Sequence, residues 1–235
     1  MNPLALSLAL ALTVALAAGS NAFGQSAPTA ARSPASLVPP GYVVTEEIRA
    51  DLNRDNQEDR VLIVKGTDKK EFSQHEQRGQ LDRNRRGLVI AFGNQGRYEL
   101  ALANLACFSS ENEDGGVYFP PELSVDIRGG SLVVHYAHGR YGYWTFTFRY
   151  QNGDFELIGH DRSESRGPVV KRSISMNFMT QKMRIRNNLN EDAEESGKER
   201  FKETWRSFAV PQRILLQKIS DFDDLVVEPP PTPAR

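Results

Sequence analysis

Residues 143–159 read YWTFTFRYQNGDFELIG, and this stretch decides the fold class of the chain. Aromatic side chains occupy every second position from Trp144 to Tyr150, with Thr and Arg between them. A strand with this alternation has one apolar face and one polar face. Asn152 and Gly153 then supply a turn that reverses the chain. The stretch therefore predicts an antiparallel hairpin with one face packed on a core.

The same signals recur on both sides of this hairpin. Three further pairs of short apolar runs are separated by turns, and two single runs precede them. The pairs are residues 88–92 with 98–103, 123–127 with 132–136, and 173–178 with 183–187, and the single runs are residues 42–48 and 60–65. We therefore expect an all-β fold, built as an antiparallel meander, a sandwich or an open barrel of hairpins.

Two highly charged stretches interrupt the strand pattern. Residues 66–86 contain few apolar side chains and are predicted to form a long solvated loop. In residues 198–208, Phe201, Trp205 and Phe208 recur at helical spacing. This spacing favours one short C-terminal helix beside the strands.

The two ends of the chain carry different signals. An uncharged apolar run near the N-terminus is followed by small residues, so residues 1–22 are predicted to be a secretory signal peptide, with an uncleaved anchor as the alternative. Residues 23–40 are rich in Ser, Ala and Pro and predict a tether, and residues 228–235 (EPPPTPAR) predict a disordered, Pro-rich tail. A single β domain then spans residues 41–227. We expect a periplasmic or secreted protein whose mature chain has no transmembrane segment.

Charge and cysteine content narrow the functional classes. The chain has 29 Lys and Arg against 30 Asp and Glu, a net charge of −1 that does not favour a nucleic-acid partner. Cys107 is the sole cysteine, so no internal disulfide holds the fold. Its apolar neighbours Leu105, Ala106 and Phe108 predict a buried thiol.

Residues 51–59, DLNRDNQED, carry the most readable chemistry. Calcium takes six to eight hard oxygen ligands, and a tight loop with oxygen donors at alternate positions can supply them. The predicted ligands are the side chains of Asp51, Asn53, Asp55 and Asp59 and the backbone carbonyl of Gln57. We therefore predict a structural calcium ion, with a solvated Asx turn that leads into a strand as the alternative.

This loop and the strand after it resemble the calcium loops of FG-GAP and VCBS-type repeats, which follow the integrin α-chain pattern D-x-D-x-D-G-x-x-D. Asn53 and Asn56 stand where that pattern has Asp and Gly. The resemblance implies calcium ligands at the same five positions. A propeller needs several blades, and the chain has one such loop.

The chain also resembles a group of uncharacterised exported bacterial proteins, over most of residues 41–224. The stretches that carry this likeness are DLNRDNQEDRVLIVK, LDRNRRGLVIAFGNQGRYELA, GGVYFPP, HYAHGRYGYWTFTFRYQNGDFELIGHD and SISMNFMTQK. This resemblance implies no particular activity.

Other residue groups give weaker signals. Tyr141 and Tyr143 precede the aromatic strand and are candidate exposed ligand-binding residues. His135 and His138 have no third metal ligand nearby in the sequence, so we do not predict a zinc site. The acidic residues 111–116 are expected to form a connecting loop, with a second weak cation site as the alternative.

These features favour an exported, non-enzymatic binding module with a structural calcium loop. Its partner would be an unknown protein, a glycan or the cell wall. One alternative is an exported hydrolase with dispersed catalytic residues, which a deep pocket with convergent carboxylates would favour. Another alternative is a periplasmic inhibitor of a cell-wall hydrolase that presents residues 66–86 as a protruding loop.

Overall fold

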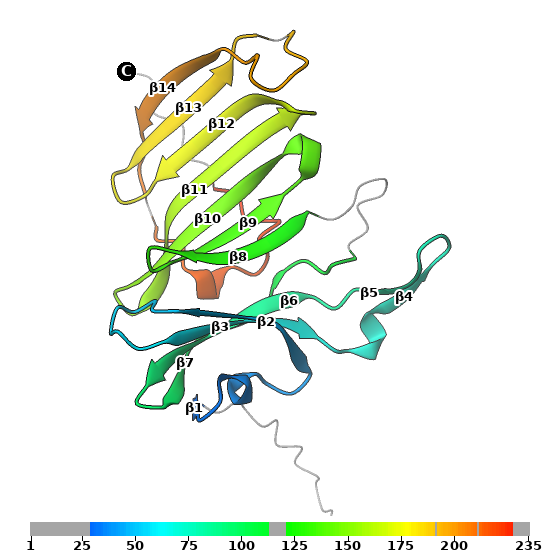
Figure 1. Cartoon of the computed structure of the whole chain (residues 1–235), viewed down its shortest axis with the longest axis vertical. Coiled ribbons are helices and arrows are strands. Elements are labelled where there is room, and N and C mark those ends of the chain that lie inside the picture. Colours follow the sequence, from blue (N-terminus) through cyan, green and yellow to red (C-terminus); the bar gives the residue numbers. More distant parts are fainter. Residues whose placement is uncertain (1–28, 113–120, 191, 211, 228–235) are drawn as a thin grey trace, which may run out of the picture.

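The computed structural model describes residues 29–112, 121–190, 192–210 and 212–227. They form two large antiparallel sheets and a separate two-stranded hairpin, and both large sheets are open rather than closed into a barrel (Figure 1). This confirms the predicted all-β fold. The predicted signal peptide and the predicted tail lie outside the described residues. Among the residues that the structure describes, none forms a helix with the length and apolar character that crossing a bilayer requires.

The first sheet has five strands in the order β1-β7-β6-β3-β2. Their bounds are β1 (Ala30–Ala31), β2 (Tyr42–Ala50), β3 (Asp59–Gly66), β6 (Arg86–Asn94) and β7 (Arg97–Phe108). Strand β3, which lies between β6 and β2, is buried on both faces: Val61 and Ile63 belong to one apolar cluster, and Leu62 and Val64 to another. Burial on both faces explains why this strand is a continuous apolar run without alternation.

The second sheet has seven strands in the order β14-β13-β12-β11-β10-β9-β8, so each strand pairs with its neighbours in sequence. Their bounds are β8 (Glu122–Arg128), β9 (Ser131–Ala137), β10 (Gly142–Gln151), β11 (Asp154–Arg166), β12 (Val169–Asn177), β13 (Lys182–Asn188) and β14 (Phe201–Ser207). The four predicted hairpins are confirmed as β6–β7, β8–β9, β10–β11 and β12–β13. Turn residues and alternation were therefore sufficient to locate them.

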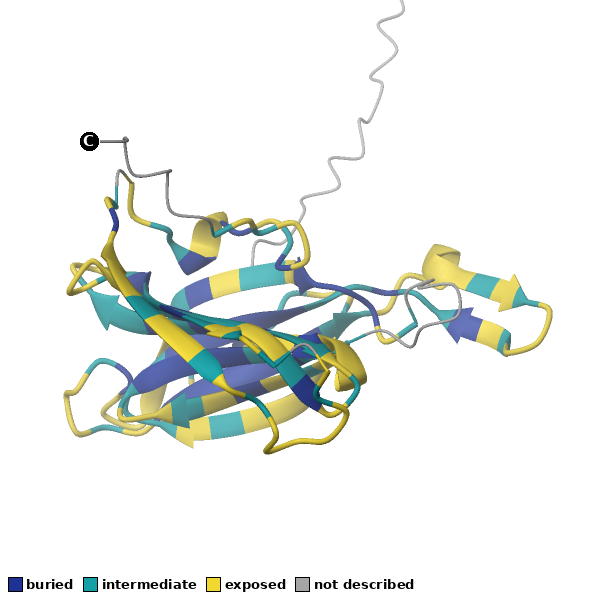
Figure 2. Cartoon of the chain, turned by 90° about the horizontal axis from the view of Figure 1, so that it is seen from above, coloured by how far each residue is buried: buried dark blue, intermediate teal, exposed yellow. Residues whose placement is uncertain are grey.

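The main core lies between the two sheets, and buried residues form a layer through the middle of the fold (Figure 2). The aromatic face of β10 supplies Phe146 and Phe148, with Trp144 and Tyr150 packed at its edges. This confirms the predicted core role of that face. The C-terminal segment also contributes to the core through three buried side chains, which are Leu216, Ile219 and Phe222.

The described part of the predicted tether is packed against the five-stranded sheet. Ala30 and Ala31 pair with β7, and the short 3₁₀ turn η1 (Pro34–Leu37) follows. Leu37 is fully buried against Leu62 and Val89 on the face of the sheet that points away from the main core. The domain therefore includes residues 29–40, which the Ser, Ala and Pro content had assigned to a tether. The burial of Leu37 against residues distant in sequence orders this segment despite its Ser, Ala and Pro content.

The predicted C-terminal helix is wrong, because this segment forms strand β14. Phe201 and Trp205 also fit a two-residue period, with Lys202, Thr204 and Arg206 on the other face. Pairing with β13 satisfies the backbone of this segment, so a tertiary partner decides between two patterns that the residues fit equally.

The predicted long loop at residues 66–86 is also corrected by the structure. It contains the 3₁₀ turn η2 (Lys69–Glu71) and the paired strands β4 (Phe72–His75) and β5 (Gly79–Asp82). This hairpin, here called the arm (residues 72–82), projects away from both sheets in Figures 1 and 2. Residues 66–86 are charged and largely exposed, as predicted, but they contain an ordered hairpin in place of an irregular loop.

Candidate functional site

The predicted calcium loop connects β2 to β3 and is shaped by its own side-chain oxygens. Asp51 accepts hydrogen bonds from two backbone N–H groups, that of Arg54 (2.7 Å) and that of Asn56 (3.1 Å). Arg54 and Asn56 both have positive φ angles, 66° and 63°. Asn56 therefore adopts the left-handed conformation for which Gly is otherwise preferred.

The middle of the loop brings three predicted ligands into contact. The side-chain oxygen Oδ1 of Asn53 accepts a hydrogen bond from the backbone N–H of Asp55 (3.1 Å). The side-chain nitrogen Nδ2 of Asn53 donates to the Asp55 carboxylate (3.0 Å). The other Asp55 oxygen accepts from the backbone N–H of Gln57 (2.8 Å). Asp55 is exposed and Asn53 and Gln57 are half-buried, and the side-chain oxygens of Asn53 and Asp55 accept hydrogen bonds from the amide groups of the loop.

Asp59 closes the loop from a fully buried position at the start of β3. One carboxylate oxygen accepts from the backbone N–H of Leu52 (2.7 Å), and the other accepts from Gly93 on β6 (2.9 Å). Burial raises the pKa of Asp59 above its ordinary value, against the lowering effect of these backbone hydrogen bonds. The negative charge of Asp55 raises it further. Asp59 thus connects the loop to a neighbouring strand at an electrostatic cost.

The loop lies at the end of the fold where turns of both sheets meet. The Gln57 side chain accepts a hydrogen bond from the backbone of Gln95 in the β6–β7 turn (2.7 Å). A Cβ atom on Gly130, in the β8–β9 turn of the other sheet, would lie 3.4 Å from the Asp51 carbonyl oxygen. Any agent that rigidifies this loop would therefore also stabilise the junction between the sheets.

The predicted ligands suit a hard cation, because they include three carboxylates and one side-chain amide within nine residues. The oxygens are arranged around N–H groups, and within the described ranges no group of three or more His, Cys, Asp or Glu side chains is placed to hold a metal ion. A carboxylate has about four lone-pair sites, and the hydrogen bonds of Asp51 use two of them. The ligand types therefore suit calcium, and the Asp51 carboxylate keeps lone pairs that its hydrogen bonds do not use.

The two predicted ligand-binding tyrosines are both exposed and lie close together in the chain. Tyr141 ends the 3₁₀ turn η3 (Gly139–Tyr141), with the Arg140 guanidinium 5.1 Å from its ring centre. Tyr143 follows at the start of β10, and its ring lies 5.3 Å from the ring of His135. Gly142 between them has a φ of 120°, and a Cβ there would lie 1.9 Å from the Ser163 carbonyl oxygen. Only glycine fits this position, so the backbone conformation at Gly142 determines the relative positions of the two tyrosines.

Cys107 and the predicted histidine pair have structural surroundings. Cys107 is fully buried, as predicted, and burial raises the pKa of its thiol to about 12. His135 bonds the Thr145 hydroxyl (2.8 Å) on the polar face of the sheet. His138 instead packs on Trp144, with ring centres 3.8 Å apart. The two histidines therefore point to different environments. Most of residues 111–116, the second candidate cation loop, lies outside the described residues.

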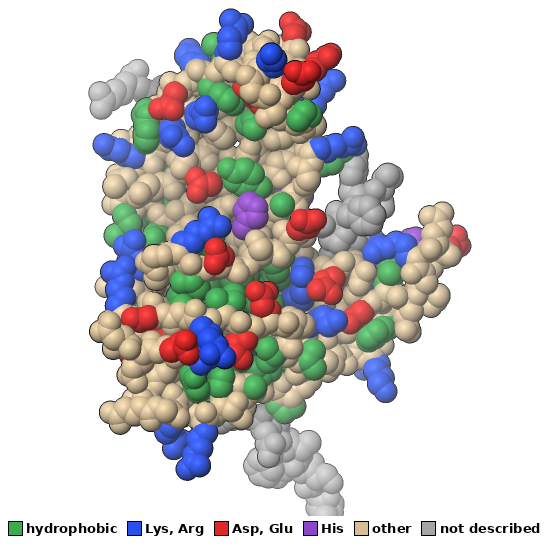
Figure 3. All heavy atoms as spheres, viewed as in Figure 1, with side chains coloured by type: hydrophobic (Ala, Val, Ile, Leu, Met, Phe, Trp, Pro, Cys, Tyr) green, Lys and Arg blue, Asp and Glu red, His purple; other side chains and the backbone are tan. Residues whose placement is uncertain are grey.

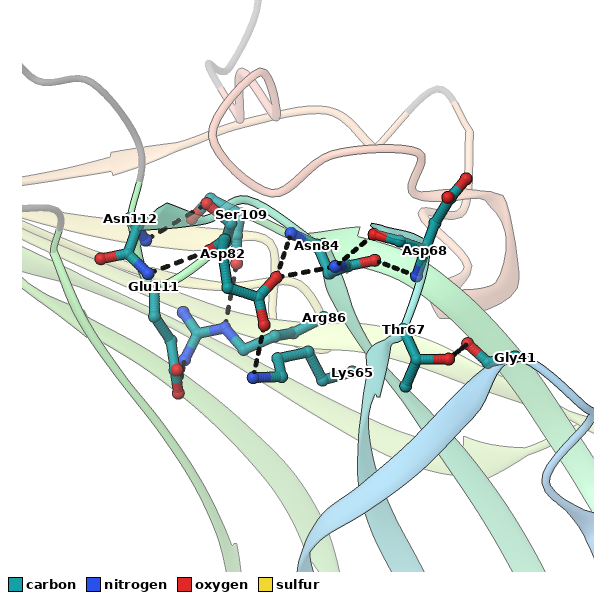
Figure 4. Close-up of polar contacts among 11 residues, drawn as sticks. Gly41, Lys65, Thr67, Asp68, Asp82, Asn84, Arg86, Ser109, Glu111 and Asn112 are labelled. Carbon is teal, nitrogen blue, oxygen red and sulfur yellow. Dashed lines mark hydrogen bonds and ion pairs between the residues drawn. The ribbon is translucent and has the colours of Figure 1, made fainter. Parts of the chain in front are cut away.

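A polar cluster centred on the buried Asn84, at the base of the arm, has no counterpart among the sequence predictions (Figure 4). Asn84 is only 3% exposed, accepts from the backbone N–H of Asp68 (2.8 Å) and donates to the Asp68 carbonyl (3.0 Å). It also donates to the Asp82 carboxylate (2.7 Å), which pairs with Lys65 (2.9 Å). Burial works to raise the pKa of Asp82, but Asn84 and Lys65 hold it below its ordinary value. The cluster fixes the direction in which the arm leaves the sheet.

The surface around these sites carries mixed charge. Figure 3 shows basic and acidic side chains interspersed over the face of the molecule seen in Figure 1. This is the distribution expected from nearly equal numbers of acidic and basic residues. Recognition on this face would therefore depend on local groups more than on a long-range field.

Comparison of the chain with protein-family models, with curated proteins and with solved structures found no match.

Proposed function

We propose that the chain is an exported, non-enzymatic binding module in which the loop at residues 51–59 holds a structural calcium ion. The observation that carries the calcium proposal is the fully buried carboxylate of Asp59, which ties this oxygen-rich loop to β6. A cation would offset the cost of burying that charge and the repulsion between Asp55 and Asp59. The proposed ligands are Asp51, Asn53, Asp55, Asp59 and the backbone carbonyl of Gln57.

The binding role is supported by the exposed tyrosines beside η3. Tyr141 is 45% exposed and Tyr143 is 39% exposed, and aromatic rings with a polar tip are suited to glycan or protein ligands. The proposed partner is therefore a glycan, the cell wall or a protein outside the cytoplasm. Export itself is tested by N-terminal sequencing of the mature protein, which should begin close to residue 23.

Thermal unfolding with calcium and with chelator tests the calcium proposal. At a calcium concentration about 100-fold above Kd, binding to the folded state alone adds about 2.7 kcal/mol. For a domain of this size, that raises Tm by roughly 5–10 °C. Asp55→Ala should abolish the shift, whereas Asp224→Ala, which removes an exposed carboxylate elsewhere, should retain it. An unchanged Tm at millimolar calcium would refute the metal assignment.

The arm favours a second candidate function, inhibition of a cell-wall hydrolase. A rigid projecting element loses little conformational entropy when it enters an enzyme cleft, and the arm has a fixed base at Asn84 and an exposed Phe72 (40%). Replacing residues 74–80 with Asn-Gly would shorten the arm and leave both large sheets untouched. If the chain inhibits a hydrolase, this variant should fold with the same Tm and lose inhibition. Equal inhibition by both proteins would exclude the arm.

A further inference from the structure

The inner face of the seven-stranded sheet continues beyond the main core. Cross-strand pairs place Phe146, His160, Met176 and Met183 in one row on this face. Phe146 packs in the core between the sheets, whereas Met176 and Met183 belong to a separate apolar cluster with Ile185. This face of β12 and β13 is therefore apolar, and Phe208, Val210 and Val227 from the C-terminal segment pack against the same cluster.

Two adjoining hollows follow this part of the sheet. Their volumes are about 260 Å³ and 330 Å³, and both are lined by His160, Arg162 and Val227. Together they form what we call the groove. The floor of the larger hollow is apolar, and its residues are Ile174, Met176, Met183 and Ile185. This size falls at the lower end of the range for small-molecule sites, and methionines adapt to ligands of varied shape.

The border of the groove is positively charged. Arg162, Arg172 and Arg206 line the larger hollow together with a single acid, Glu164. Arg162 pairs with Glu164 (3.1 Å), and Arg172 lies opposite Glu164 across the β11–β12 pair. Arg206 lies opposite Met183, and its side chain has no ion pair within the described part of the chain. The free positive charge is therefore at the β14 end of the apolar floor.

His160 adds a polar but uncharged group to the wall. Burial lowers its pKa, and its Nδ1 lies 3.1 Å from the backbone carbonyl of Thr145. A carbonyl can only accept, so Nδ1 donates and Nε2 of the neutral ring is an acceptor. Around the two hollows, the three arginines outnumber the two acids, which are Glu164 on the larger hollow and Asp223 on the smaller one.

From this combination we infer that the groove binds a single-chain amphiphile with an anionic head group. The aliphatic chain lies on the Ile and Met floor, and the head group pairs with Arg206. The chain's own C-terminal residues 228–235 begin beside Val227, but their sequence EPPPTPAR has one acid, one base and no long aliphatic side chain. An external amphiphile therefore matches the groove better in both charge and apolar character.

This inference goes beyond the proposed function and is independent of the calcium loop. The groove is built from β10–β14 and the C-terminal segment, whereas the loop connects β2 to β3. A failure of calcium binding would leave the groove unchanged, and the reverse also holds.

Tryptophan fluorescence provides a direct binding assay, because Trp144 lines the smaller hollow and Trp205 lies exposed on β14. In the full chain carrying Trp205→Phe, dodecanoate below its micellar concentration should change the Trp144 emission saturably. Butanoate, which lacks the chain length, and dodecyltrimethylammonium, which has the opposite charge, should leave it unchanged at the same concentrations. No saturable change with dodecanoate, or an equal change with the cationic amphiphile, would overturn the inference.

Arginine variants then locate the head group. Arg206→Gln should weaken dodecanoate binding about tenfold and leave dodecanol binding unchanged, because only the carboxylate uses the guanidinium. Arg184→Gln is the matched control, since Arg184 lies opposite Trp205 on the other face of the sheet. Equal affinity of the two variants would overturn the assignment. So would binding that occurs only after deletion of residues 228–235, because the tail would then be the occupant.

Discussion

Replacing Asp59 by Asn tests how the loop is fastened to the sheet. The carboxylate accepts one backbone N–H on each oxygen, from Leu52 and from Gly93. An amide of the same shape has a single acceptor oxygen, so one of these buried N–H groups would face an NH₂ group instead. An unsatisfied buried donor costs about 1–3 kcal/mol.

Two effects oppose each other in this variant. Loss of the acceptor destabilises the fold, whereas removal of a buried charge relieves the desolvation that raises the Asp59 pKa. Each unit of pKa shift corresponds to about 1.4 kcal/mol, so the relief offsets part of the loss. We expect a net destabilisation of about 1–2 kcal/mol at neutral pH in chelator, which lowers Tm by roughly 3–6 °C.

The pH dependence separates the two effects. Because the pKa of Asp59 is raised by folding, the folded state binds a proton more readily than the unfolded state between the ordinary value of 3.8 and the raised value. The parent therefore gains stability from this group as pH falls through that window, and Asn at this position cannot. The stability difference between parent and variant should widen with falling pH, while other carboxylates contribute equally to both proteins.

Asp224→Asn provides the control, since it makes the same charge change at an exposed position outside the loop. It should change stability in chelator by about 0.5 kcal/mol or less, with no added pH dependence. The assay is thermal unfolding monitored by circular dichroism at several pH values. If Asp59→Asn unfolds at or above the parent Tm throughout, the reasoning about its two hydrogen bonds is refuted.

Three further predictions concern other parts of the fold. Asn84→Ala should speed tryptic cleavage in the arm about tenfold with little change in global Tm, because its hydrogen bonds fix the arm base; unchanged cleavage would contradict this. Cys107, whose thiol pKa is raised to about 12 by burial, should resist maleimide labelling at pH 8 until denaturant is added; rapid labelling of the folded protein would show that the site opens. Tyr136→Phe should leave the free energy of unfolding unchanged or raise it by up to about 1 kcal/mol, because the buried hydroxyl has no hydrogen-bond partner among the described residues. A clear loss of stability would reveal a bound water.

The hairpins could be predicted because their signals are local. Alternation in β10 and the turn at Asn152 and Gly153 lie within one stretch of chain, and the structure places the residues accordingly. The positive φ of Asn56 was also readable from the loop pattern. Local chemistry thus determined both the strands and the backbone of the candidate metal loop.

The features that sequence reasoning missed depend on distant partners. The site that buries Leu37 is built by β3 and β6, and β14 is a strand because β13 offers it an edge. Asn84 has no periodic signal, since its role depends on Asp68 and Asp82 meeting it at the arm base. The position of Arg206 beside an apolar floor likewise depends on the pairing of β14 with β13, which no local pattern predicts.

The strictly sequential order of the seven-stranded sheet has a consequence for how the chain folds. Each strand can add to its predecessor through a local connection, the longest being residues 189–200 between β13 and β14, so the entropy lost at each step is small. The C-terminal segment is different, because Phe222 donates its backbone N–H to Cys107, more than 100 residues earlier. We therefore expect this contact to form late, after the meander has grown strand by strand. Residues 214–227 would then pack last, against two sheets that have already formed.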